Sequence, residues 1–273
     1  MAERPPLRVV VRGIGDVSSA IAHRLFRAGY AVVIHDSPQP TVTRRGMAFA
    51  DAVFEGRAIL EGVQAVRTDD ATHLPTVLSD RSVIPVVVTD LAETLAVVRA
   101  DVLVDARMRK RVRPEVQLGL APLTIGLGPG FVGGETTDLV VETSWEALGQ
   151  VVTSGSALPL AGEPHPIDGF RRERYVYAPV AGVFHTRSRI GDLVAAGEAI
   201  AQIGMTALAA PLAGVIRGLT RDGVPVSTGT KVVEIDPRSD MPMVRGIGER
   251  PGRIADGVLE AIHMWLKARR PGA

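Results

Sequence analysis

Apolar residues in the first half of the chain fall into short runs that alternate with helix-like patterns. The first run, at residues 9–11, precedes a glycine turn, and residues 20–25 then place apolar side chains at the spacing of one helix face. Further apolar runs lie at 31–34, 83–88, 102–106 and 123–127. Because near-continuous apolar runs are typical of strands buried on both faces, we predict an α/β fold with a Rossmann-like, doubly wound parallel sheet.

The turn after the first strand is a candidate phosphate-binding loop. Gly13 permits a sharp turn, and Gly15 would allow a phosphate to approach the backbone at a helix N-terminus. Ser18 stands where the dinucleotide fingerprint has its third glycine, and Asp16 places a carboxylate where a phosphate would lie. Asp36, at the end of the next strand, occupies the usual place of an acceptor for ribose hydroxyls. Such turns also occur as plain architecture.

A dense basic segment at residues 107–113 follows the strand that ends at 105. Its candidate ligands for an anionic cofactor are Arg107, Arg109 and Arg111. The alternative is a solvated loop without a ligand. Arg44 and Arg45, at the start of a predicted helix at 43–54, leave the same two interpretations open, and we favour the solvated first turn there.

Five glycines between residues 126 and 134 predict an irregular backbone that closely approaches either a ligand or a neighbouring domain. Gly128 and Gly130, just after a predicted strand, are candidates for the cofactor site. Contact with a neighbouring domain explains them equally well. Upstream, apolar residues at 58–60 and 63–66 predict a short strand pair.

The second half contains an internal repeat with an offset of 32 residues. Three blocks recur at this spacing: 178–184 at 210–216, 191–197 at 223–229, and 199–203 at 231–235. The repeat predicts two quasi-equivalent β units that pack face to face, and this half resembles the biotinyl/lipoyl type of barrel-sandwich hybrid. Carrier members of that group place a modified lysine between the repeats, where residues 203–208 hold none. We therefore expect no biotin or lipoate attachment, but a rigid binding or docking module.

Composition narrows the function classes. The chain has 273 residues, a formal net charge of +1 and no cysteine, which excludes disulfides, thiolate metal sites and cysteine nucleophiles. The near-neutral charge and the scarcity of aromatic residues do not favour nucleic acid as a partner. No apolar run reaches membrane-spanning length and no metal-binding histidine pair occurs, so we expect a cytoplasmic protein without a membrane or metal role.

The arrangement as a whole resembles the YqeB-like accessory family of selenium-dependent molybdenum hydroxylase systems. The resemblance rests on segments 11–16, 22–25, 28–29, 54–56, 103–108, 125–131, 141–143 and 235–238. It implies a protein that helps to mature, store or insert a molybdenum cofactor into xanthine-dehydrogenase-like enzymes. After Thr143 the chain departs from the family pattern of Asn-Arg-Gly-His, which suggests different cofactor contacts or a selenium-independent enzyme.

These patterns predict three parts: a Rossmann-like domain at 1–135, a β domain at 136–245 and an amphipathic helix at 246–273. The preferred hypothesis is a maturation factor that binds an anionic, nucleotide-like cofactor between the two domains, with a molybdenum hydroxylase subunit as partner. An NAD- or NADP-dependent oxidoreductase and a non-catalytic docking adaptor are the alternatives. No catalytic residue can be nominated, and the ligand, the partner surface and the oligomeric state stay open.

Overall fold

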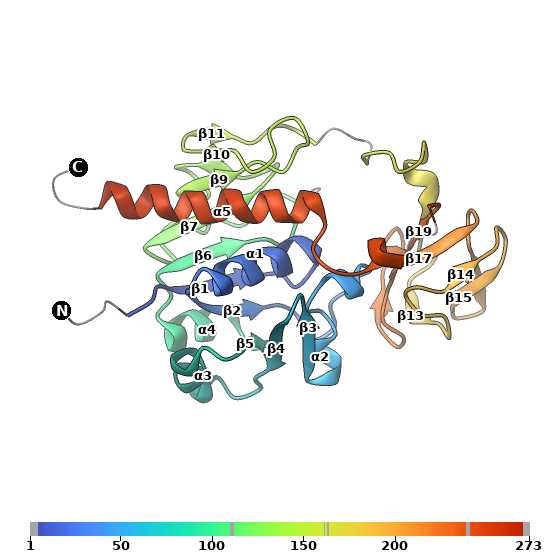
Figure 1. Cartoon of the computed structure of the whole chain (residues 1–273), viewed down its shortest axis with the longest axis horizontal. Coiled ribbons are helices and arrows are strands. Elements are labelled where there is room, and N and C mark those ends of the chain that lie inside the picture. Colours follow the sequence, from blue (N-terminus) through green and yellow to red (C-terminus); the bar gives the residue numbers. More distant parts are fainter. Residues whose placement is uncertain (1–4, 110–111, 161, 163, 239–240, 270–273) are drawn as a thin grey trace.

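A large sheet crosses most of the molecule (Figure 1) in the computed structural model, which describes residues 5–109, 112–160, 162, 164–238 and 241–269. Its strands are β1 (Arg8–Arg12), β2 (Ala31–His35), β3 (Arg57–Leu60), β4 (Val63–Arg67), β5 (Ile84–Val87), β6 (Val102–Asp105), β7 (Leu123–Leu127), β9 (Leu139–Val141) and β10 (Val151–Val152). They lie in the order β10-β9-β7-β6-β1-β2-β5-β4-β3. The short strands β8 (Val132–Gly133) and β11 (Gly155–Ser156) pair separately.

Five α-helices accompany the sheet in the described part of the chain: α1 (Asp16–Arg27), α2 (Ala52–Glu55), α3 (Leu74–Asp80), α4 (Leu91–Val98) and α5 (Glu249–Ala268). Short 3-10 turns lie at Arg45–Met47, Ala71–His73, Arg172–Arg174 and Met241–Val244. The predicted helix at 43–54 is therefore only a 3-10 turn followed by the single turn of α2. The predicted C-terminal amphipathic helix is confirmed as α5.

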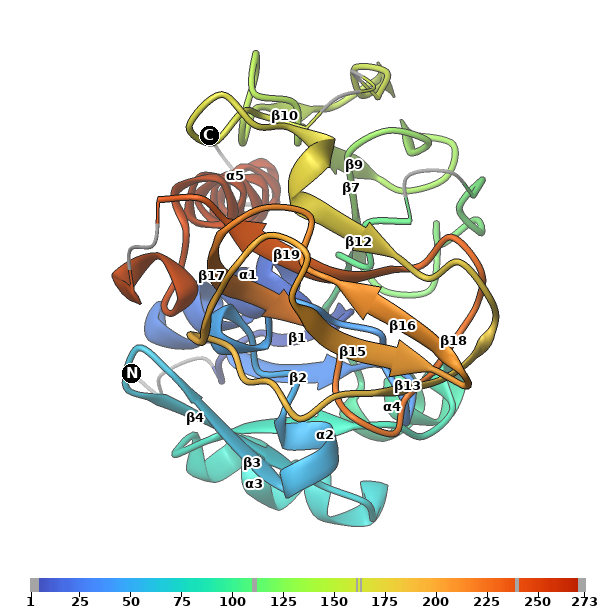
Figure 2. The same cartoon turned by 90° about the vertical axis from the view of Figure 1, so that its right-hand side faces the viewer.

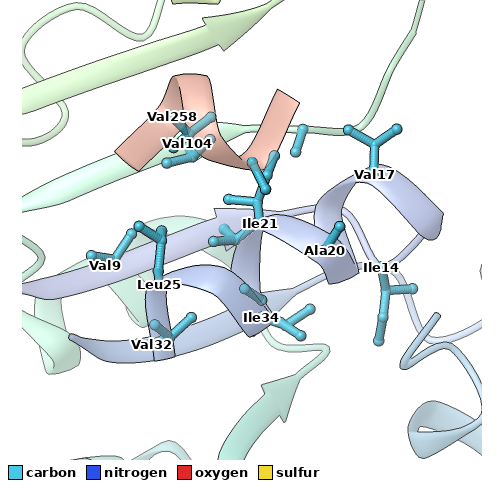
Figure 3. Packing of buried hydrophobic residues seen from close by; sticks show 14 of the residues in the cluster. Val9, Ile14, Val17, Ala20, Ile21, Leu25, Val32, Ile34, Val104 and Val258 are labelled. Carbon is cyan, nitrogen blue, oxygen red and sulfur yellow. The ribbon is translucent and has the colours of Figure 1, made fainter. Parts of the chain in front are cut away.

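The two faces of the sheet carry different cores because strand side chains alternate between faces. Val9 and Val11 of β1 pack with Ile21 of α1 and Val258 of α5, whereas Val10 packs on the opposite face, against the layer that contains α3 and α4. Figure 3 shows how side chains from β1, β2, α1 and α5 meet in the first of these cores. The C-terminal helix thus completes the layer that the N-terminal half begins.

Helix α5 packs closely against the chain at two glycines, Gly257 and Gly149. A Cβ at Gly257 would lie 2.6 Å from the Cα of Gly149, so this crossing has no room for a side chain. An ion pair of 2.9 Å between Arg24 and Asp256 joins α1 to α5 at the surface.

The remaining strands form a smaller β unit that lies beside the large sheet in Figure 1 and faces the viewer in Figure 2. They are β12 (Tyr175–Tyr177), β13 (Gly182–His185), β14 (Leu193–Val194), β15 (Ala199–Ile203), β16 (Thr206–Ala209), β17 (Gly214–Leu219), β18 (Pro225–Val226) and β19 (Lys231–Asp236). Two four-stranded sheets result, β12-β19-β17-β14 and β16-β15-β13-β18. The repeated blocks become equivalent strands, and each repeat contributes its short strand, β14 or β18, to the sheet of the other repeat.

The α/β class is confirmed, but the predicted combination of a Rossmann-like parallel sheet with a barrel-sandwich hybrid is wrong. β3 runs antiparallel to β4 and β10 runs antiparallel to β9, so the large sheet is mixed. β9 and β10 belong to that sheet although they lie beyond residue 135, where the sequence suggested a domain boundary. Periodicity identifies a strand, but it does not say which sheet the strand joins. In the described residues, no helix is both long and apolar enough to span a bilayer.

Candidate functional site

Asp105, the last residue of β6, organises a polar cluster at the carboxyl edge of the sheet. Its carboxylate is buried and accepts hydrogen bonds from Arg107 Nε at 3.0 Å, from Arg12 Nη1 at 3.4 Å and from the amide of Gln117. Burial lowers the pKa of Arg12, although Asp105 opposes that shift. Arg12 Nε is itself buried without a hydrogen-bond partner among the described residues.

Glu115 joins the same cluster from the loop at 112–118. Arg107 Nη2 lies 2.5 Å from Glu115 Oε2, and Arg109 Nη1 lies 3.4 Å from Oε1. Arg12 Nη1 approaches Oε2 to 3.7 Å. The hydrogen bond from Arg107 lowers the pKa of Glu115 to about 2. Burial opposes the charged form of Arg107, but its bonds to Asp105 and Glu115 outweigh burial and raise its pKa. The carboxylates thus hold the guanidinium groups together.

A cavity of about 20 Å³ lies beside these side chains, which is room for about one water molecule. Its lining includes charged residues, among them Asp105, Arg107 and Arg109, and the apolar residues Leu127 and Phe131. An anion held by the arginines would therefore have an apolar wall next to it.

The glycines of the segment 126–134 fit closely around this place. Gly130 has a φ of +95°, and a Cβ there would lie 3.1 Å from Pro114 in the 112–118 loop. Gly128, at a φ of +71°, lies against the side chain of Thr143. Protein contacts thus account for both positive-φ glycines.

In the predicted phosphate-binding loop, the chain's own groups make the contacts that a phosphate was expected to make. Gly13 donates to His35 O at 2.8 Å and, at a φ of +110°, packs against the backbone of Ala106. Gly15 is the residue before α1, and the buried Ser18 hydroxyl donates to Gly15 O at 3.1 Å. Asp16, the first residue of α1, accepts a hydrogen bond from Val17 N at 3.0 Å. The helix N-terminus, where a phosphate was expected, therefore already faces a carboxylate.

Arg44 connects that carboxylate to the β unit. Its Nη1 lies 2.9 Å from Asp16 Oδ2, and its Nε and Nη2 lie 3.0 and 2.8 Å from the two oxygens of Glu234 in β19. Burial opposes the charge on Asp16, but Arg44 outweighs burial and lowers its pKa. The favoured interpretation of Arg44 as part of a solvated turn is wrong, because it is a structural cation between the two parts of the molecule.

The residues that the sequence predicted for one site therefore lie at separate places in the structure. Of those that the structure describes, Arg107 and Arg109 line the cavity, and Gly130 lies against Pro114, which also lines it. Asp36 lies after β2, accepts from Ser37 N at 2.6 Å, and has a pKa that burial raises. Arg111 lies outside the described residues.

Sequence reasoning missed Arg12, Glu115 and Gln117 as members of the cluster. Arg12 gave a weak signal because it ends β1 directly before the glycine turn. Glu115 and Gln117 lie in a loop without periodic pattern, so only the fold brings them to Asp105.

A second, open hollow of about 350 Å³ lies between α1 and α5, near Glu61. None of the site residues predicted from the sequence lines it. Across the described ranges, no group of three or more His, Cys, Asp or Glu side chains is placed to hold a metal ion.

Comparison with known proteins gives one close relative by sequence. The chain is 40% identical over 262 residues to the uncharacterized protein YqeB of Escherichia coli (strain K12), covering 94% of this chain and 48% of that protein. It is YqeB-like. The chain spans about half the length of this curated relative. No family model matches the chain.

Among solved structures, the ectoine utilization protein EutE (DoeB) from Ruegeria pomeroyi is similar at 13% identity and a TM-score of 0.26, covering 85% of each chain. A succinylglutamate desuccinylase from Silicibacter sp. TM1040 is similar at 11% identity and a TM-score of 0.26, again with 85% of each chain covered. A succinylglutamate desuccinylase/aspartoacylase from Rhodobacter sphaeroides has 14% identity and a TM-score of 0.25, with 84% and 85% covered.

Proposed function

We propose that this chain is a cytoplasmic accessory protein for molybdenum hydroxylases that binds an anionic, nucleotide-like cofactor at the carboxyl edge of the large sheet. The observation that supports the binding part is the convergence of Arg12, Arg107 and Arg109 on Glu115 beside the cavity. The pathway part is supported by the resemblance described from the sequence and by the similarity to YqeB.

The donor set fits the phosphate end of such a cofactor. Guanidinium groups bind phosphate in a planar, bidentate manner, and Arg12 has an unused buried donor in the described part of the chain. Since the cavity has room for about one water molecule, no more than one phosphate oxygen would enter it, and the ring system would stay outside. Arg107 and Arg109 would hold the phosphate, and Phe131 would contact the adjoining apolar part. The molybdenum cofactor is cargo in this proposal, and its redox chemistry belongs to the hydroxylase.

Titration of the full chain with inorganic pyrophosphate, followed by isothermal calorimetry, tests the binding part. Arg109→Ala removes an exposed guanidinium and should weaken binding about tenfold, the usual cost of one charge-assisted contact. Arg57→Ala, an exposed arginine of β3, makes the same chemical change away from the site and should leave binding unchanged. Equal affinities of wild type and Arg109→Ala would refute the site.

The pathway part is tested by mass spectrometry of anaerobically purified protein, native and then denatured, with molybdenum quantified in parallel. A co-purified molybdopterin species supports the proposal. A co-purified nicotinamide dinucleotide instead would overturn it in favour of an oxidoreductase.

A further inference from the structure

One exposed carboxylate occupies the point on which the three arginines converge. The Glu115 side chain is 58% exposed, whereas those of Arg12 and Arg107 are only 11% and 13% exposed. Glu115 oxygens lie 2.5 Å from Arg107, 3.4 Å from Arg109 and 3.7 Å from Arg12. A carboxylate held in this way has the position and charge that a bound anion would have.

We propose that Glu115 is a built-in competitor of the ligand, and that a phosphate or pyrophosphate group binds by displacing it from Arg107 and Arg109. This inference rests on the proposed function, because it concerns the same arginines. It assigns the ligand to the class of polyanionic phosphates and gives Glu115 the role of setting the threshold for binding.

The fixed and movable parts of the cluster are separated in a way that suits this exchange. Asp105 is buried and contacts Arg12 and Arg107, so both cations stay in place when Glu115 leaves. Gln117 anchors the next part of the loop, because its side chain donates to Asp105 and its backbone N donates to Thr136 O at 2.8 Å. Only the short exposed stretch around Glu115 has to move.

Protonation does not open the site near neutral pH. With a pKa of about 2, Glu115 stays charged under those conditions, so another anion must replace it. A carboxylate tethered by a short loop competes at an effective concentration of about millimolar or higher. A free monocarboxylate carries the same single negative charge as Glu115, so it gains no electrostatic advantage over the tethered side chain.

Charge balance favours a dianion or a higher anion. With Glu115 displaced, the three guanidinium groups that contacted it face the single charge of Asp105, and Arg113 also lines the cavity, so at least two positive charges are left to neutralise. A phosphate monoester carries close to two negative charges near neutral pH and pyrophosphate carries more, and both have enough oxygens to accept from several arginines at once. These anions can therefore outcompete the tethered carboxylate.

Glu115→Gln tests the proposal in the full chain, with inorganic pyrophosphate and acetate as probes at pH 7.5. The variant should bind pyrophosphate about tenfold more tightly than wild type, since the tethered competitor loses its charge. Acetate should bind the variant measurably and wild type only above millimolar concentration. Glu260→Gln, at an exposed position of α5, makes the same change in net charge and should have the wild-type affinity.

The direction of the effect separates a competitor from a structural residue. If Glu115 served only to position the arginines, Glu115→Gln would bind pyrophosphate more weakly or equally, and the inference would be overturned. If wild type binds and Arg109→Ala weakens binding while Glu115→Gln has no effect, the inference fails and the proposed function stands. If neither wild type nor Glu115→Gln binds pyrophosphate, both fail together.

Discussion

Replacing Glu234 by glutamine tests whether a buried ion cluster joins the large sheet to the β unit. Glu234 is fully buried in β19 and accepts from Arg44 Nε and Nη2, from Arg174 Nη1 at 2.9 Å and from Lys231 Nζ at 3.0 Å. Burial opposes its charge, but Arg44 and Lys231 outweigh burial and hold the pKa of Glu234 well below its usual range. The Glu234→Gln variant removes the charge and leaves one acceptor oxygen.

Among the three cations, Arg174 is the one most affected by the loss of the Glu234 charge. Arg44 keeps Asp16 as a partner, and the Lys231 side chain is 31% exposed, so water can solvate it. Arg174 is buried, and its other acceptors are the carbonyl oxygens of Phe170 and His165 and the hydroxyl of Tyr175. Breaking a buried pair from one side costs about 3–5 kcal/mol, and we expect a loss of that size at pH 7.

Urea unfolding of the wild type, Glu234→Gln and the exposed control Glu260→Gln provides the measurement. Because the folded pKa of Glu234 lies below its unfolded value, near 4.5, the carboxylate stabilises the fold above that pH and its contribution disappears as the pH falls below it. The gap between wild type and variant should therefore be widest near neutral pH and shrink below pH 4.5. A loss below about 1 kcal/mol at pH 7, as for exposed ion pairs, would refute a structural cluster.

Two further predictions concern packing and burial. Gly257→Ala should lower the free energy of unfolding by about 1–3 kcal/mol, because its Cβ meets the backbone of Gly149, whereas Gly252→Ala in the same helix should be neutral or stabilising; equal effects would contradict the close crossing. Asp36→Asn should stabilise the protein at pH 7, because burial raises the pKa of the native carboxyl and its charge therefore costs stability above that pKa. The gain should vanish below pH 3.8 in urea titrations, and a variant less stable at pH 7 would show that the charge is needed.

Local pattern predicted much of the secondary structure, because local pattern reflects burial. The alternation of Val9, Val10 and Val11 between two cores follows from the strand period alone, and the apolar stripe of α5 follows from the helix period. The pair predicted at 58–66 is confirmed as β3 and β4. The repeat of 32 residues returned as equivalent strands, but no periodicity could indicate that β14 and β18 change sheets.

Tertiary partners decided the roles of charged residues, and the sequence does not identify those partners. The sequence around Arg44 is typical of a solvated turn. Only the fold brings Glu234, 190 positions later, beside it. A helix cap, in contrast, is a local contact: Asp90, directly before α4, accepts from Ala92 N at 2.8 Å, as aspartate commonly does at the start of a helix. Local chemistry was therefore predictable, and contacts across the chain were not.

Asp16 and Glu115 show why a glycine fingerprint alone misplaces a ligand. Both carboxylates stand where an anion would bind, one at the N-terminus of α1 and the other among three arginines. The partner of Asp16, Arg44, also bonds the buried Glu234, so a phosphate there would have to break the contact between the two parts of the molecule. Glu115 is exposed and lies on a loop, so a phosphate can replace it while Asp105 keeps the cations in place. The site that a ligand can open is thus the one beside β6, although the sequence motif pointed to the turn after β1.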